Sequence, residues 1–419
     1  MEQLNLIIDT YQRIILESES QLAKVKRHIY RIGTLRLILF AAGVAGIIYF
    51  WSEGRLVISG IAAITFIPFL LLVKLHNRLF RQKDYLEKKI EINRQELQAI
   101  AYDTSAFDNG KEFIDPAHLY TYDLDVFGEH SLFQYINRTA TQPGKKRLAE
   151  WMNTHLKNKA EIEKRQEAVK ELAPELEMRQ HFRILGLLHK GKTADEEEIR
   201  NWATSPEYYR KKWYFRTLAI LVPLANAVCL GLAIAGVISF TTWGIVFAGI
   251  GLLSSSFSKG VSQMQSVYGK KMQILTTYAH LIHIIEEKEM ESSALKRVKG
   301  LVGGEKQTAS QAVKRLTALM NALDQRNNML MQFVLNGLFF WELRQVMKIE
   351  TWKESFAANL PHWLEAIGEM DAYCSLATFA YNHPGYVFPE IASKPFCMEA
   401  EALGHPLMDR DKCVRNDIQ

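Results

Sequence analysis

The stretch "TLAILVPLANAVCLGLAIAGVISFTTWGIVFAGIGLLSSSFS", residues 217–258, has 42 consecutive residues without a charged side chain. One membrane-spanning helix needs about 20 apolar residues. The stretch therefore predicts two spans that turn near "SFTTW", residues 239–243. A buried pair of helices in a soluble protein is the alternative. The length of the run favours the membrane, because core helices are usually shorter.

A second pair of apolar segments lies near the N-terminus. The segments "LILFAAGVAGIIYFWS", residues 37–52, and "LVISGIAAITFIPFLLLV", residues 56–73, have no charged residue and are joined through "SEGR". They predict a transmembrane hairpin over about 35–52 and 56–73. Small residues four positions apart, Ala42 with Gly46 and Gly231 with Ala235, would let the helices of each hairpin approach closely.

Positive charge lies on one side of both predicted hairpins. Lysines and arginines cluster just before and just after each pair, whereas the two outer turns hold a single arginine. The positive-inside rule then predicts a multi-pass protein of the cytoplasmic membrane, with both termini and all soluble domains in the cytoplasm and lipid as a partner. A long amphipathic helix before the first apolar run argues against a cleaved signal peptide.

The soluble segments are helical in pattern. Residues 4–32 and 79–100 have apolar side chains at spacings of three, four or seven. Because each segment continues a predicted span, we expect the two to form an antiparallel coiled coil; a stripe that binds a protein partner is the alternative for part of this surface. The four cysteines are widely spaced without a CxxC pair. This argues against a zinc site or a disulfide framework and fits a reducing compartment.

Helical patterns continue through most of the remaining chain. We expect helices within residues 130–200, with turns at "TQPGK" and "HKGKT", and long helices over 259–299, 307–348 and 351–381. Strand signals are scarce until the last 30 residues. There "KPFCMEAEALGHPLM" and "KCVRNDIQ" predict short strands that enter a new domain.

The segment "GLLHKGKT", residues 186–193, matches the phosphate-binding loop pattern literally. That pattern requires a strand before it and a helix after it. The preceding residues have a helical period, and Thr193 with Glu196 forms a capping-box pattern in an acidic first turn that would repel phosphate. We therefore interpret the segment as a loop followed by a capped helix.

A metal site is a weaker alternative on another helix. His280, His283 and Glu287 share one helix face in "HLIHIIEE", and such residues can bind a metal. No fourth ligand is evident, so an ordinary helix face is the preferred interpretation. We assign no metal ligand and no catalytic residue, since no nucleophile arrangement can be argued from the sequence.

One block of sequence resembles a known family. Residues 122–172, "YDLDVFGEHSLFQYINRTATQPGKKRLAEWMNTHLKNKAEIEKRQEAVKEL", are similar to the opening of the core domain of the MutS mismatch-repair family. The residues that carry the resemblance are Leu124, Asp125, Phe127, Asn137, Arg138, Thr139, Thr141, Gly144, Arg147, Leu148, Trp151, Ile162, Arg165, Ala168 and Val169. In physical terms, Thr141 and Gly144 suit a polar turn between helices, and Leu148 and Trp151 suit a bundle core.

The C-terminal segment resembles the same family. "EAIGEMDAYCSLATFAYNHPGYVFPEI" is similar to its return helix, and "EALGHPLMDRDKCVRNDIQ" to the entry into its ATPase domain. The resemblance implies that a phosphate loop, with ATP and Mg as cofactors, follows beyond residue 419. It also places Cys413, Val414 and Asn416 beside the adenine, although Cys413 stands where an aromatic residue is often found.

The apolar runs, the helical patterns and the resemblance together predict a mainly α fold: a helical bundle with long lever helices, two transmembrane helical hairpins and the start of an α/β ATPase domain. We expect N-terminal coiled-coil helices with a hairpin (1–103), a core helical domain (104–216), a second hairpin in place of the DNA clamp (217–258), lever and return helices (259–392) and the beginning of the ATPase domain (393–419). The family's mismatch-reading domain is absent, and the first hairpin occupies its place.

Two functions follow as hypotheses. In the first, a membrane-anchored MutS-like protein couples a C-terminal ATPase to the membrane; this chain itself has no activity, the full-length protein is an ATPase, and it forms a homodimer through that domain. DNA binding and a role in DNA repair stay open, because the family's mismatch-reading domain and its DNA clamp are both missing. In the second, a non-catalytic membrane scaffold binds a protein partner through its helices. A phosphate loop shortly beyond residue 419 would favour the first.

Overall fold

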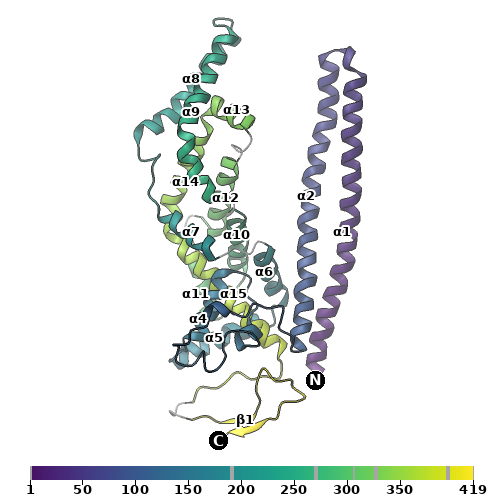
Figure 1. Ribbon diagram of the computed structural model, residues 1–419, viewed down its shortest axis with the longest axis vertical. Coiled ribbons are helices and arrows are strands. Elements are labelled where there is room, and N and C mark those ends of the chain that lie inside the picture. The colour runs from purple at the N-terminus through teal and green to yellow at the C-terminus, as the bar shows by residue number, and fades with distance from the viewer. Residues whose placement is uncertain are drawn as a thin grey trace. The chain divides into compact units, whose positions relative to one another are not determined.

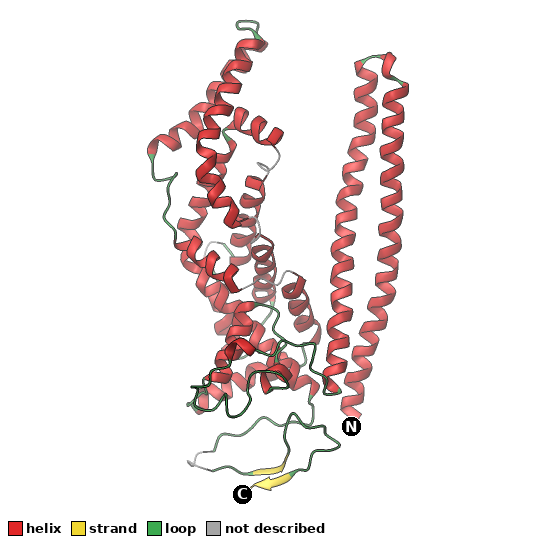
Figure 2. Cartoon of the chain, in the orientation of Figure 1, coloured by secondary structure: helices red, strands yellow, loops and turns green. Residues whose placement is uncertain are grey.

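The computed structural model describes residues 2–188, 193–268, 272–304, 307–324, 329–392 and 397–418. The described chain is mainly α-helical, as predicted (Figures 1 and 2). It divides into two compact units. The first comprises Met1–Arg138, Ala173–Leu188 and Leu376–Gln419; the second comprises Thr139–Leu172 and His189–Ser375.

The first unit contains the predicted N-terminal hairpin. Helices α1 (Glu2–Tyr49) and α2 (Arg55–Ile100) run side by side (Figure 1). The short 3-10 helix η1 (Trp51–Glu53) and Gly54, whose φ is 98°, form the turn at "SEGR". Leu22, Val25, Leu86 and Ile90 pack together between the two helices, which confirms the apolar stripes read from the sequence.

The rest of the first unit consists of short helices, loops and a strand pair. It contains the 3-10 helix η2 (Lys111–Phe113), α3 (Leu132–Ile136) and α6 (Leu176–Leu188), which packs against α2. Strands β1 (Ala400–Leu403) and β2 (Asn416–Ile418) form an antiparallel pair with Ala400 opposite Ile418. The two short strands predicted near the C-terminus are thus confirmed.

The second unit is a helical bundle. Its helices are α4 (Gln142–Asn153), α5 (Lys159–Leu172), α7 (Thr193–Thr204), α8 (Trp213–Ile234), α9 (Phe240–Tyr268), α10 (Met272–Glu287), α11 (Ser293–Val302), α12 (Ala309–Asp324), α13 (Met329–Phe339), α14 (Trp341–Phe356), the 3-10 helix η4 (Ala357–Asn359) and α15 (Leu360–Asn382), whose last residues belong to the first unit. Figure 1 places α8 and α9 at one end of this unit and α4 and α5 at the other.

Among the residues that the structure describes, three helices are long and apolar enough to cross a membrane: α1, α2 and α8. The described side chains of α9 add a shorter apolar helix, Phe240–Ser254. The turn between α8 and α9 covers residues 235–239, with Gly236 at a φ of 76°, a few residues earlier than the sequence predicted. Apolar side chains of α8 are exposed, among them Ile220 and Leu224.

The long helices predicted after residue 258 are shorter than expected. The prediction of one helix over 259–299 is wrong, because α10 ends at Glu287 and the backbone N–H groups of Glu291 and Ser292 bond to the Glu171 carboxylate instead of extending a helix. The helix predicted over 307–348 is interrupted at Phe340, which has a left-handed φ of 51°. The helix predicted over 351–381 restarts at Leu360, because Pro361 has no backbone N–H and suits a first turn.

The segment "GLLHKGKT" follows a helix, as expected. Gly186 to Leu188 end α6, so no strand precedes the pattern. Residues 189–192, and the side chains of the predicted capping box at Thr193 and Glu196, lie outside the described residues.

Candidate functional site

The carboxylate of Glu350 on α14 binds the loop that leads into α8. One oxygen accepts hydrogen bonds from the backbone N–H groups of Tyr208 at 2.8 Å and Tyr209 at 3.0 Å, and the other accepts from that of Arg210 at 2.6 Å. Glu350 is 3% exposed. A carboxylate surrounded by backbone donors is a strong, charge-assisted acceptor, so this contact fixes the entry of α8 on α14.

Lys353, one turn further along α14, holds the same loop. Its ammonium donates to the carbonyl oxygen of Ser205 at 2.6 Å and to the Ser205 hydroxyl at 2.8 Å, and it lies 5.3 Å from the ring centre of Trp202. Burial lowers the pKa of Lys353. We call Glu350, Lys353 and loop residues 205–210 the α14 junction.

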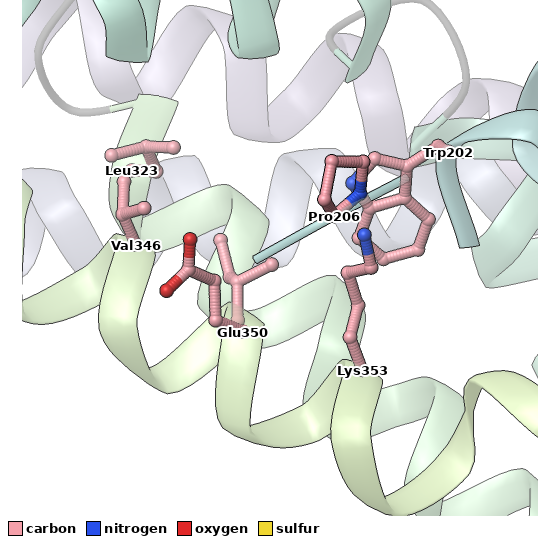
Figure 3. A pocket seen from close by; sticks show the side chains of 7 residues that line it. Trp202, Pro206, Leu323, Val346, Glu350 and Lys353 are labelled. Atoms are coloured by element: carbon pink, nitrogen blue, oxygen red, sulfur yellow. The ribbon is translucent and has the colours of Figure 1, made fainter. Parts of the chain in front are cut away.

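A small pocket lies beside the α14 junction, with room for roughly one water molecule. Figure 3 shows its lining by Trp202, Pro206, Leu323, Val346, Glu350 and Lys353. Its walls are side chains of three separate helices and a loop, packed closely together. The arrangement therefore suits a rigid contact between these helices and the loop rather than the binding of a substrate or nucleotide.

Buried hydrogen bonds also hold the apolar α8–α9 hairpin together. The buried amide of Asn226 on α8 donates to the carbonyl oxygen of Gly337 on α13 at 3.0 Å, and its oxygen accepts from the indole of Trp243 on α9 at 3.0 Å. An unpaired amide is costly in apolar surroundings. These bonds therefore favour one arrangement of α8, α9 and α13.

At the other end of the second unit, Asp371 of α15 holds the turn before α4. Its carboxylate accepts from the hydroxyl of Thr141 at 2.7 Å, from the backbone N–H of Thr141 at 2.8 Å and from that of Ala140 at 3.0 Å. The Thr141 hydroxyl in turn accepts from the N–H of Gly144 at 3.0 Å and caps α4. The predicted polar turn at "TQPGK" is thus confirmed, together with a partner 230 residues away.

Trp151, predicted to anchor the bundle, stacks edge-on against Tyr373 with ring centres 4.8 Å apart. The guanidinium of Arg165 lies 4.1 Å from the Trp151 ring centre. Leu148 is buried, also as predicted. Residues 139–172 therefore pack on α15 through a polar turn at one point and an aromatic group at another.

A buried ionic cluster joins the N-terminal hairpin to the rest of the first unit. Glu96 of α2 binds Arg138 at 2.8 Å and also pairs with Arg183 of α6. Asn382 donates to Glu96 at 2.9 Å and accepts from the hydroxyl of Tyr11 at 2.8 Å. Burial alone would raise the pKa of Glu96, but the two guanidiniums hold it below its usual value.

His383 lies next to this cluster, just after α15. Its Nε2 is 2.7 Å from the hydroxyl of Tyr135, and its Nδ1 is 2.7 Å from the carbonyl oxygen of Phe379. Since a carbonyl only accepts, Nδ1 carries the proton, and Nε2 accepts from Tyr135. Burial lowers the pKa of His383 to about 4, so the ring is neutral.

The residues predicted to lie beside adenine occur together near β2. Cys413 precedes the strand, with its Sγ 4.0 Å from the carbonyl oxygen of His405. Val414 is exposed, and Asn416 pairs across the sheet with Leu403. Their role in nucleotide binding stays a prediction.

Of the predicted metal candidates, His283 has its Nε2 3.3 Å from a carboxylate oxygen of Glu287 on α10, and His280 lies on the same helix. The described residues contain no group of three His, Cys, Asp or Glu that could hold a metal ion.

Sequence reasoning missed three buried acids that bind other elements of the fold: Glu96, Glu350 and Asp371. Glu350 and Asp371 each lie one turn after a buried apolar residue of the same helix, Val346 and Ile367 respectively. A buried acid in such a position requires donors, and this signal could have identified Glu350 and Asp371.

A protein family model matches much of the chain. The family model described as MutS domain III matches residues 118–377. The match begins before the "NRTATQPGK" turn and ends within α15, and it includes the apolar α8–α9 hairpin. The chain matches no curated protein and no solved structure.

Proposed function

This chain belongs to the MutS family through its domain III, and from that premise we propose that it is a membrane-anchored MutS-like protein in which the lever helices connect an ATPase domain following residue 419 to the bilayer. The anchors would be the α1–α2 and α8–α9 hairpins. A role in DNA repair or DNA binding is proposed on the family match alone, because MutS is a mismatch-repair family.

One observation carries the proposal. An apolar hairpin stands within domain III, where the family resemblance puts the DNA clamp between lever helices, and Glu350 ties its entry to α14 with three backbone hydrogen bonds. A displacement of α14 would therefore be passed to α8 rather than absorbed by the loop. Asp371 and Thr141 would play the same part at the opposite end, between α15 and α4.

ATP and Mg are proposed for the full-length protein, with Cys413, Val414 and Asn416 near the adenine and a homodimer formed through the ATPase domains. Lipid is the proposed partner of the hairpins. The basic flanks of the hairpins suit the cytoplasmic side of a membrane and contact with anionic lipid.

The test uses the full-length protein in lipid nanodiscs. We expect Mg-dependent ATP hydrolysis, and a change in amide exchange of loop 205–212 when a non-hydrolysable ATP analogue binds. Glu350→Gln should keep hydrolysis but abolish the nucleotide effect on the loop. Lys348→Gln, a control on the same helix with an exposed side chain, should keep both. Absence of hydrolysis would leave the scaffold hypothesis, and an equal loop response in Glu350→Gln would contradict the coupling.

A further inference from the structure

Helix α13 shows a combination of features that neither the family nor the predicted hairpins explain. Its eleven residues, "MLMQFVLNGLF", contain no charged residue. Met331, Phe333, Val334 and Phe339 are each more than 40% exposed. A soluble protein rarely leaves so many large apolar side chains in contact with water on one short helix.

The polar groups of α13, in contrast, are bonded inside the protein. The amide of Gln332 donates to the carboxylate of Glu342 at 2.7 Å, and the oxygen of Asn336 accepts from the backbone N–H of Glu342 at 3.0 Å. Asn336 thereby closes the break in the helix at Phe340. Internal pairing of polar groups with apolar side chains outside is the arrangement that hydrocarbon surroundings require.

The exposed face of α13 continues the surface of the apolar hairpin. Phe333 packs edge-on against Phe247 of α9 at 5.3 Å, and Gly337 approaches Phe247 so closely that a Cβ there would clash with its ring. Asn226 of α8 bonds to the carbonyl oxygen of Gly337. Whatever solvent surrounds α8 and α9 at this level therefore also surrounds α13.

Helix α13 lies in the sequence between α12 and α14, and these two helices are packed together. Helix α12 packs against α14, and the indole of Trp341, at the start of α14, donates to the carbonyl oxygen of Ala322 near the end of α12 at 3.1 Å. Eleven residues of helix extend about 16 Å, roughly half of a bilayer core. The helix is therefore too short to cross, and the chain before and after it lies on one side.

We propose that α13 inserts into the bilayer beside α8 and α9 as a short helix that enters and leaves on the side of the lever helices, with its exposed face against lipid acyl chains. This rests on the proposed function only in that α8 and α9 must themselves be in the membrane. The lever would then be held at the membrane by three apolar helices at this site, one of which connects α12 directly to α14.

The test attaches an environment-sensitive fluorophore to single cysteines in the full chain, in vesicles of phosphatidylcholine with or without bromine on the acyl chains. Three sites are compared: Val334→Cys on α13, Val228→Cys on α8 and Ala318→Cys, an exposed position on α12. We expect brominated lipid to quench the Val334 probe as strongly as the Val228 probe and to leave the Ala318 probe unchanged.

The outcomes separate the inference from the proposed function. Quenching at Val228 without quenching at Val334 would overturn the insertion of α13 and leave the anchor intact. Quenching at neither site would overturn both. Crosslinking of Val334→Cys to a second copy without quenching would show a protein interface instead, which also overturns the inference.

A second measurement avoids replacing the native cysteines. A photoreactive phenylalanine analogue at Phe333 should crosslink to lipid upon irradiation, and the same analogue at Ala318 should not. Failure at Phe333, with lipid crosslinks from Val228, would likewise contradict the inference.

Discussion

The carboxylate of Asp371 accepts the hydroxyl hydrogen of Thr141 at 2.7 Å, although the two residues are 230 positions apart. The same carboxylate accepts two buried backbone N–H groups. In domain III of this chain, one acid on the return helix α15 therefore fixes the turn that precedes α4.

Asp371→Ala should destabilise the protein by about 3 kcal/mol, because it leaves several buried donors without their acceptor. Thermal or denaturant unfolding in detergent micelles measures the difference. Glu365→Ala is the control: it lies on the same helix, its side chain is 34% exposed, and its carboxylate lies 3.8 and 3.7 Å from the guanidiniums of Arg147 and Arg297. Its loss should cost below about 1 kcal/mol. Equal effects of both changes would contradict the role of Asp371.

Gly144→Ala should also destabilise the protein, by about 1–3 kcal/mol. A Cβ at position 144 would lie 2.1 Å from the carboxylate of Asp371, so the acid would have to move away from Thr141. Gly300→Ala on α11 meets no atom within 4 Å. Because alanine favours a helix over glycine, that control should be neutral or stabilising by up to about 1 kcal/mol. The same unfolding measurement compares the two variants.

Glu96→Gln should destabilise the first unit by about 3–5 kcal/mol, since the buried Arg138 and Arg183 lose their counter-charge. Glu87→Gln on the same helix is the matched control. Glu87 pairs with Lys26 at 3.0 Å, but both side chains are more than a third exposed, so its loss should cost below about 1 kcal/mol. A small effect of Glu96→Gln would show that the cluster does not hold the hairpin in place.

His383 predicts a pH dependence of stability. An unfolded histidine titrates near pH 6.5, whereas burial lowers the pKa of His383 to about 4. Its contribution is therefore complete above about pH 6.5. Between that pH and about 4, the unfolded chain binds a proton that the folded chain does not, so the free energy of unfolding falls by about 1.4 kcal/mol per pH unit.

His383→Asn cannot titrate in this range, so its free energy of unfolding should fall less steeply over the same pH interval. Parallel curves for the wild type and the variant would rule out the buried neutral ring as a cause. The measurement is a series of denaturant titrations between pH 7 and pH 4 in one detergent.

The hairpins and the polar turn at Thr141 were predictable from sequence, because long uncharged runs and turn chemistry are local signals. The end of α10 after Glu287 was not, because it depends on a distant partner: the Glu171 carboxylate binds the backbone N–H groups of residues 291 and 292. The break at Phe340 has a local contact, from the backbone N–H of Glu342 to the oxygen of Asn336. Its left-handed residue is a phenylalanine, however, so the sequence does not mark it as a helix break. Helix α13 was not predicted as a separate helix, because its apolar pattern continues that of its neighbours.

The candidate site shows the same limit. The backbone N–H groups that bond to Glu350 belong to residues 208–210, about 140 positions earlier. Sequence spacing cannot bring such groups together without the fold. A buried acid on an apolar face indicates that a partner exists but does not identify it.

The proposed function requires that the α8–α9 hairpin crosses the membrane while the lever helices stay in the cytoplasm. Cysteine labelling in intact cells tests it most directly. Thr241→Cys, exposed just after the turn of the hairpin, and Gln311→Cys, exposed on α12, are compared in a background without other cysteines. We predict that an impermeant maleimide added outside the cytoplasmic membrane labels position 241, and labels position 311 only after the membrane is opened. Protection of both positions in intact cells, with labelling of both after lysis, would contradict the account.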